Sequence, residues 1–334
     1  MKIRELEKFL EKPPVEVIVL FATLFLFILT DRLLTDDSEW AFLRFLFAVL
    51  VIAEMLFILG VEVKQNTKKH GWKHEVVDTI VALLVALGIW FGAMFVLNTS
   101  SPVSGVVSCS MLPNLYRGDF VVVQGADPTA YHISMSKDDF ADFEQDYSLV
   151  FQGGESHTVP GSLYSFCIFN PSADLCKGFA SSPREYLEKR GPLTYKYEMC
   201  SIETQDGTVT SSPCVASVSY GEKEYLTNFS HDIIVYQPPV TDLYGRVGDI
   251  VHRALFVINV DGETYYLTRG DNNPVLDIQV YDYNTMMGNH PVSSENFKGK
   301  VILRVPVLGY FKLLISGFWK EDEQCKWQMD YPHV

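Results

Sequence analysis

Three long apolar runs in the N-terminal part of this 334-residue chain limit what it can fold into. They cover residues 15–34, 40–61 and 76–97. Each run has about twenty mostly apolar residues, the length of α-helix that crosses a hydrocarbon core of roughly 30 Å. A buried helix or a signal-peptide core explains one such run, whereas three in succession indicate a membrane region. The sequence therefore predicts a three-helix transmembrane region over residues 1–97.

Charged residues beside these runs predict their orientation. The N-terminus and the second connection are rich in lysine, while the first connection is acidic. The residues concerned are Lys2, Arg4, Lys8 and Lys12, then Lys64, Lys68, Lys69 and Lys73, and finally Asp36, Asp37 and Glu39. Because lysine and arginine favour the cytoplasmic side of a membrane, these charges predict the orientation of the three runs. We expect a multi-pass protein of the cell membrane. Its N-terminus would be cytoplasmic and the domain after residue 97 extracytoplasmic.

The part of the chain after residue 97 is acidic and has the pattern of a β domain. Of the net charge of −14, residues 98–334 carry −12, which argues against binding to nucleic acid. Short β-branched and aromatic runs, separated by Gly, Pro, Asp and Asn, predict antiparallel strands. We place them at residues 119–124, 233–237, 250–259, 264–268 and 300–305. The predicted fold class is a membrane-anchored α+β protein, in which three transmembrane helices precede a mainly antiparallel β domain.

A serine, a histidine and two carboxylates in this part of the chain are candidates for nucleophilic catalysis. A serine hydroxyl needs a neighbouring base, and a neutral imidazole suits that task near pH 7. A carboxylate then fixes the tautomer of the histidine and supports the imidazolium. In this scheme Ser110 attacks, His252 accepts its proton, and either Asp277 or Asp271 holds the histidine. The Ser110 backbone N–H and the Ser108 hydroxyl are the candidate donors to the oxyanion.

The sequences around these residues resemble three motifs of type I signal peptidases, specifically the branch found in archaea and in the endoplasmic reticulum. The motifs are Ser-Cys-Ser-Met-Leu-Pro at 108–113 with Gly-Asp at 118–119, Gly-Asp-Ile-Val-His-Arg at 248–253, and Thr-Arg-Gly-Asp-Asn-Asn at 268–273 followed by Asp277. The resemblance implies Ser110 as nucleophile, His252 as general base and Asp277 as third member. It implies Asp271 as a supporting acid. The bacterial branch has lysine at the position of His252, so a Ser-Lys dyad is disfavoured. Cys109 stands where the family usually has glycine.

By this resemblance the chain is a membrane serine endopeptidase that removes signal peptides from exported preproteins after small residues. It implies a strand-rich catalytic domain. The expected partners are secretory preproteins, the lipid bilayer and, as a further candidate, the protein-translocation channel. We expect no cofactor and no metal. Two other interpretations stay open: a non-catalytic scaffold of the same fold at the secretion machinery, and a membrane protease with other substrates.

The spacing of the motifs predicts a large insertion. About 140 residues separate the nucleophile motif from His252, more than this branch usually needs. We place the excess in an inserted extracytoplasmic subdomain. The expected domains are a membrane region at 1–97, a catalytic domain at 98–125 and 231–318, the insertion at 126–230, and a C-terminal tail at 319–334.

Four of the six cysteines lie in the predicted insertion. Outside the cytoplasm they can oxidise. The simplest pairs join Cys167 to Cys176 and Cys200 to Cys214, although four cysteines allow three pairings. Zinc binding is the alternative role for these cysteines, but their spacings are wider than the Cys-x2-Cys pair of many zinc sites.

Overall fold

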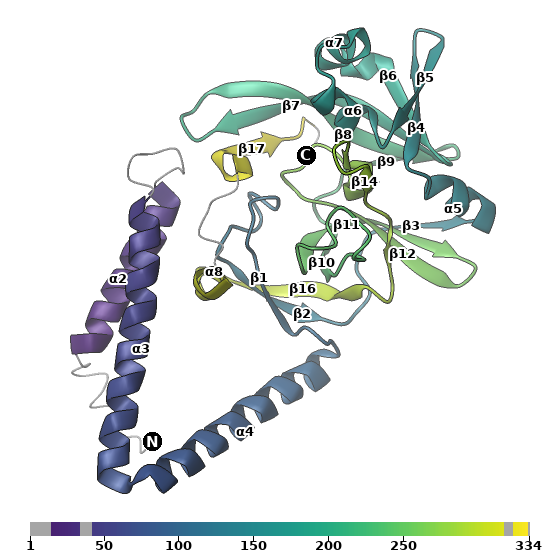
Figure 1. Cartoon of the computed structure of the whole chain (residues 1–334). Helices are drawn as coiled ribbons and strands as arrows, with labels where there is room; N and C mark the ends of the chain where they lie inside the picture. Colours follow the sequence, from purple (N-terminus) through teal and green to yellow (C-terminus); the bar gives the residue numbers. More distant parts are fainter. Residues whose placement is uncertain (1–14, 34–41, 317–322, 333–334) are drawn as a thin grey trace. The chain divides into compact units, whose positions relative to one another are not determined.

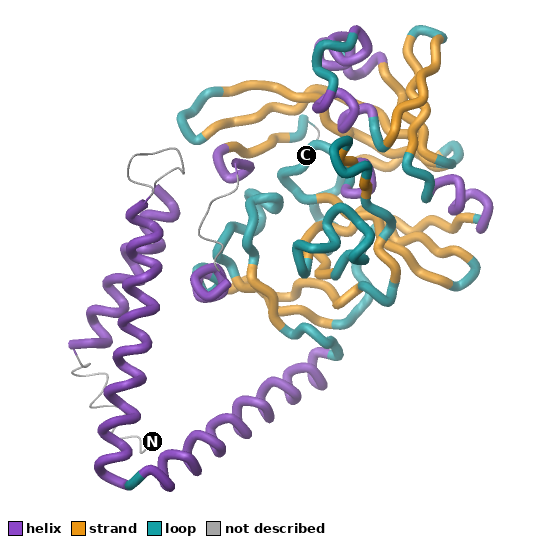
Figure 2. Tube along the Cα trace, viewed as in Figure 1, coloured by secondary structure: helices purple, strands orange, loops and turns teal. Residues whose placement is uncertain are grey.

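The computed structural model describes residues 15–33, 42–316 and 323–332. The chain divides into two compact units. One unit comprises Met1–Val96 and Leu308–Glu321, and the other comprises Leu97–Val307 and Asp322–Val334. Long helices make up the first unit, whereas strands dominate the second (Figure 2). The prediction of N-terminal helices followed by an antiparallel β domain is therefore confirmed.

The described residues of the first unit form helices (Figure 1). They are α2 (Val15–Leu33), α3 (Phe42–His70), α4 (Trp72–Leu97) and α8 (Tyr310–Ser316). Within the described ranges, α3 and α4 are long and apolar enough to cross a membrane, while α2 is apolar but shorter. Residues 1–14 and 34–41, which hold the N-terminal lysines and the acidic connection, lie outside the described residues. The number of membrane crossings and the orientation stay predictions.

Side chains of different helices in the first unit contact one another. The Thr23 hydroxyl of α2 donates to Glu54 Oε1 of α3 at 3.0 Å. An ionisable side chain in the middle of an apolar helix needs such a polar partner if lipid surrounds it. Tyr310 of α8 packs edge-on against Phe27 of α2, with the ring centroids 6.1 Å apart. The C-terminal apolar segment thus packs against a helix of its own unit.

Two large sheets form the frame of the second unit, and β13 (Tyr281–Asp282) and β14 (Met287–Gly288) pair as a small third one. The first sheet contains β1 (Val103–Gly105), β2 (Phe120–Gln124), β3 (Tyr131–Met135), β10 (Ile233–Tyr236), β11 (Ile250–Val260), β12 (Glu263–Arg269), β15 (Val292–Ser293) and β16 (Phe297–Val305). Its strand order is β1-β2-β16-β10-β11-β12-β15, and β3 pairs in parallel with β11. All five strands predicted from the sequence belong to this sheet.

The second sheet contains β4 (Tyr147–Gln152), β5 (Glu155–Pro160), β6 (Tyr186–Arg190), β7 (Leu193–Thr204), β8 (Val209–Tyr220), β9 (Lys223–Leu226) and β17 (Trp327–Asp330). Its order is β5-β4-β6-β7-β8-β9, and β17 pairs with β7. Short elements complete the unit: α5 (Lys137–Phe143), α6 (Leu163–Phe169), α7 (Asp174–Ser181), β13 (Tyr281–Asp282), β14 (Met287–Gly288), and the 3-10 turns η1 (Pro183–Glu185), η2 (Asp277–Gln279) and η3 (Glu323–Lys326).

The two sheets share one hydrophobic core. Tyr131 of β3, Tyr225 of β9 and Phe256 of β11 pack together, with ring centroids of Tyr225 4.9 Å from Tyr131 and 5.2 Å from Phe256. Full burial of one large apolar side chain stabilises the folded state by roughly 1.5–3 kcal/mol. Residues 126–230 supply strands to both sheets, because β3 lies in the first sheet and β4 to β9 lie in the second. The tail joins the second sheet through β17. The second sheet is therefore packed into the same folded body as the first.

Candidate active site

Ser110 lies in the turn-rich loop between β1 and β2. Two backbone hydrogen bonds close the base of this loop: Val106 N donates to Asp119 O at 2.9 Å, and Gly118 N donates to Val106 O at 2.9 Å. Met111, next to the serine, is 1% exposed and belongs to a core cluster of the first sheet. The base of the loop and the residue next to Ser110 are therefore both anchored.

Ser110, His252 and Asp277 come together from three separate elements. His252 is the third residue of β11, and Asp277 begins η2. His252 Nε2 lies 2.9 Å from Ser110 Oγ, and His252 Nδ1 lies 2.7 Å from Asp277 Oδ2. All three side chains are buried. A histidine that carries its proton on Nδ1 satisfies both contacts, since it donates to the carboxylate and leaves Nε2 free to accept the serine proton.

Hydrogen bonds from other side chains fix the orientation of Asp277. Its Oδ2 atom accepts from Thr268 Oγ1 at 2.6 Å and from the Tyr236 hydroxyl at 3.1 Å. Burial, and then the negative charge of Asp277, hold the pKa of Tyr236 well above its usual value, so the phenol stays a hydrogen-bond donor. Asn289 Nδ2 donates to the backbone oxygen of Asp277 at 3.0 Å. The oxygen that faces His252 thus accepts hydrogen bonds from two further donors.

Asp271, the second candidate carboxylate, lies in a different network. Arg253 Nε donates to Asp271 Oδ1 at 2.7 Å, and Arg253 Nη2 donates to Oδ2 at 2.6 Å. Asn114 Nδ2 also donates to Oδ2 at 2.7 Å. Both partners of the ion pair are buried. Since Arg253 follows His252 on β11 and Asn114 follows the nucleophile motif, Asp271 braces these two segments against each other.

Ser108, the candidate oxyanion donor, lies beside Ser110. Its Oγ atom is 3.2 Å from Ser110 Oγ. Both serines and His252 line one cleft of about 370 Å³. Most other lining residues are apolar. Two of them come from segments outside the three motifs: Ile168 from α6, beside the second sheet, and Trp327 from the C-terminal tail. The cleft therefore combines a polar centre with apolar walls.

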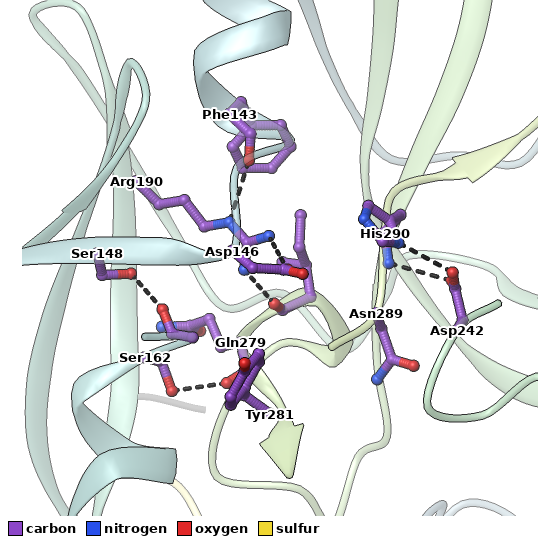
Figure 3. Close-up of polar contacts among 12 residues, drawn as sticks. Phe143, Asp146, Ser148, Ser162, Arg190, Asp242, Gln279, Tyr281, Asn289 and His290 are labelled. Carbon is purple, nitrogen blue, oxygen red and sulfur yellow. Dashed lines mark hydrogen bonds and ion pairs between the residues drawn. The ribbon is translucent and has the colours of Figure 1, made fainter. Parts of the chain in front are cut away.

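Residues beside and within the second sheet hold the turn that carries Asp277. Arg190 Nη1 of β6 donates to the backbone oxygen of Ile278 at 2.5 Å, and Ser162 Oγ donates to that of Gln279 at 2.6 Å (Figure 3). Arg190 Nε also donates to the Phe143 oxygen at 3.0 Å. The two residues after Asp277 are thus fixed by side chains from residues 126–230, which the sequence did not predict.

A buried glutamate completes this support. Glu188 of β6 is fully buried, and it accepts hydrogen bonds from Leu163 N at 3.0 Å and from Gln279 Nε2 at 3.4 Å. Burial raises the pKa of Glu188 above its usual value. The Ser148 hydroxyl lies 2.9 Å from Glu188 Oε1 and 2.7 Å from the Gly161 oxygen, although it has one proton to donate. A neutral Glu188 resolves this conflict, because its own proton then serves Ser148 while Ser148 serves Gly161.

Three disulfides link the six cysteines. Cys167 pairs with Cys176, and Cys200 pairs with Cys214, so the pairing predicted for the insertion is confirmed. The third disulfide joins Cys109, adjacent to Ser110, to Cys325 in the tail. Sequence reasoning missed this pair; the replacement of a usual glycine by cysteine at 109 was its signal. No group of three or more His, Cys, Asp or Glu side chains within the described residues is placed to hold a metal ion.

Family models and curated proteins were compared with the sequence of this chain. No protein-family model matches the chain, and a search of the curated proteins finds no match to it. The likeness to signal peptidases therefore remains an expectation, which rests on three short motifs and on the side chains that they bring together.

Proposed function

We propose that this chain is a membrane serine endopeptidase of the signal peptidase I type, with Ser110 as nucleophile, His252 as general base and Asp277 as third member. The observation that carries the proposal is the hydrogen-bonded chain from Ser110 Oγ through the imidazole to Asp277, at 2.9 and 2.7 Å. Nucleophile, base and orienting acid in contact, inside a cleft, are the constellation that acyl transfer needs.

The residues suggest a sequence of steps. Ser110 Oγ attacks the scissile carbonyl carbon while His252 Nε2 takes its proton, and Asp277 stabilises the resulting imidazolium. The Ser108 hydroxyl and the Ser110 backbone N–H donate to the oxyanion. The imidazolium then protonates the leaving amine. Water, activated by the same histidine, releases the acyl group from Ser110 and completes hydrolysis. Asp271 takes no proton in this scheme and supports the loop and the strand that carry the reacting groups.

The substrates would be preproteins whose signal peptides end in small residues, presented where a signal helix leaves the bilayer. Three crossings with a cytoplasmic N-terminus would place the cleft outside the cytoplasm. The three disulfides support that side, because such bonds persist in oxidising compartments. The lipid bilayer and the protein-translocation channel are the partners that this position implies.

Cleavage of a preprotein by the purified full-length chain tests the proposal. In detergent, the wild type should release the signal peptide at one site, mapped by mass spectrometry. Ser110→Ala should reduce cleavage to near background, and the Ser110→Ala, His252→Ala double variant should be hardly worse, because members of one catalytic unit are non-additive. Ser181→Ala is the matched control, since this exposed serine lies on α7.

The same experiment separates the other interpretations. A folded wild type that binds preproteins and cleaves none would be a scaffold. Cleavage of other membrane proteins, with preproteins left intact, would indicate a membrane protease with other substrates. Equal activity of Ser110→Ala and wild type would remove Ser110 from the mechanism.

A further inference from the structure

The C-terminal tail is fixed to both halves of the second unit. Its strand β17 lies alongside β7 of the second sheet (Figure 1). Trp327 stands opposite Thr204 in this pairing. Two residues earlier, Cys325 is disulfide-bonded to Cys109. Since Cys109 precedes Ser110 directly, a covalent link joins the tail to the nucleophile loop.

Asn272 adds a second link between the same segments. Its side chain is fully buried. Asn272 Nδ2 donates to the Cys109 oxygen at 3.2 Å and to the Trp327 oxygen at 3.0 Å, while Oδ1 accepts from Met329 N at 2.7 Å. The backbone N of Asn272 donates to the Ser110 oxygen at 2.7 Å. One residue thus uses both its backbone and its side chain to hold the tail beside the nucleophile.

The tail also supplies part of the cleft wall. Trp327 lines the cleft that contains Ser110 and His252, and it is partly accessible to solvent. Ile168 of α6 lines the same cleft and is 60% exposed. Large apolar side chains that remain accessible in a concave site are typical of surfaces that bind a ligand. If Ser110 is the nucleophile, as proposed above, the ligand of this cleft is the peptide to be cleaved.

We propose that Trp327 is a specificity-determining residue, which contacts an apolar side chain of the peptide substrate. The Cys109–Cys325 disulfide and Asn272 act as positioning groups that fix this wall relative to Ser110. The inference rests on the proposed endopeptidase function, and it goes beyond it by assigning substrate binding to a tail outside the three motifs.

Steady-state cleavage of one preprotein by Trp327 variants of the full-length chain tests the contact. Trp327→Ala should raise KM at least about tenfold with kcat changed less than about twofold, because an apolar contact made equally in ground and transition states affects binding alone. Trp327→Phe should restore most of the affinity. Gln328→Ala is the matched control, since its side chain is exposed on the same strand. An active wild type with unchanged KM in Trp327→Ala would overturn the assignment.

A double-mutant cycle tests the positioning role. Replacing Cys109 and Cys325 together by serine should lower kcat/KM at least about tenfold, and Trp327→Ala should then add less than about twofold, because the wall that carries the indole is no longer linked covalently to the loop of Ser110. A full additional tenfold loss would show that the disulfide does not position Trp327. If the serine variant fails to fold, the Trp327 series alone still decides the contact. A wild type that cleaves no preprotein would overturn the proposed function itself, a result distinct from either failure.

Discussion

Replacing each site carboxylate by its amide separates a catalytic role from a supporting one. Asp277→Asn keeps the side-chain shape and removes the charge beside His252. Thr268 and Tyr236 both donate to the oxygen that faces the imidazole, so the amide oxygen of the variant should keep that position. The histidine should then keep its proton on Nδ1. We expect the rate to fall through the loss of charge alone.

The size of this loss follows from the distance between the charges. Two unit charges about 4 Å apart interact by about 4 kcal/mol at an effective dielectric constant of about 20. At about 1.36 kcal/mol for each factor of ten, kcat should fall about 10³-fold. If the amide nitrogen faced His252 instead, the wrong tautomer would increase the loss to about 10⁴-fold, the magnitude known for a Ser-His-Asp triad.

Asp271→Asn should behave in the opposite way. The variant loses the two-point ion pair with Arg253 and leaves that buried guanidinium without a carboxylate. Breaking a buried pair costs about 3–5 kcal/mol. At about 2–4 °C for each kcal/mol in a domain of this size, the unfolding temperature should fall by roughly 6–20 °C. The rate at a temperature where the variant is folded should fall less than about tenfold, because Asp271 does not touch the reacting atoms.

Preprotein cleavage and thermal unfolding by circular dichroism, measured on the same detergent-solubilised samples, compare the two variants. The reasoning is refuted if Asp271→Asn, while stably folded, loses more activity than Asp277→Asn, and the two roles must then be exchanged. If both losses are below about tenfold, a Ser-His dyad replaces the triad.

Three further predictions concern the fold. Glu188→Gln should unfold near the wild-type temperature, whereas Glu188→Ala should unfold at a lower temperature. Of these three proteins, only the wild type should lose stability as pH rises through the raised pKa of Glu188, because burial favours the neutral form of this carboxyl group. Replacing residues 147–226 by a short linker should abolish cleavage, since the turn of Asp277 loses its supports. All six native cysteines are in disulfides and should not react with a thiol reagent. A cysteine placed at Ser38 should react with a membrane-impermeant thiol reagent on intact cells, and one placed at Gln65 should not. The reverse pattern would show the opposite orientation in the membrane.

Local patterns in the sequence were sufficient for much of the first sheet. The runs at 119–124 and 250–259 become β2 and β11 within a residue or two, because alternation and turn residues act over a few positions. The short disulfides were predictable for a similar reason, since Cys167 and Cys176 are 9 residues apart. The run at 40–61 lies mostly within α3, which continues to His70.

Contacts between distant segments were not accessible in this way. Cys109 and Cys325 are separated by 216 residues, and no periodicity reports such a pair. Glu188 has the sequence pattern of an ordinary strand residue, and its burial becomes visible only when β6 packs beside η2. The two carboxylates were also ambiguous in sequence. What separates their roles is which cation or ring lies within hydrogen-bonding distance, and that depends on the tertiary fold.

The three residues of the proposed triad differ in how much support they need. His252 lies on β11, whose backbone is paired on both sides by β10 and β12, so its position follows from the sheet. Ser110 and Asp277 lie on a loop and a short turn, which do not fix a side chain by themselves. The tail holds the first through a disulfide and Asn272, and residues 126–230 hold the second through Ser162, Arg190 and Glu188. The additional segments therefore attach at the two places where the proposed triad would otherwise lack support.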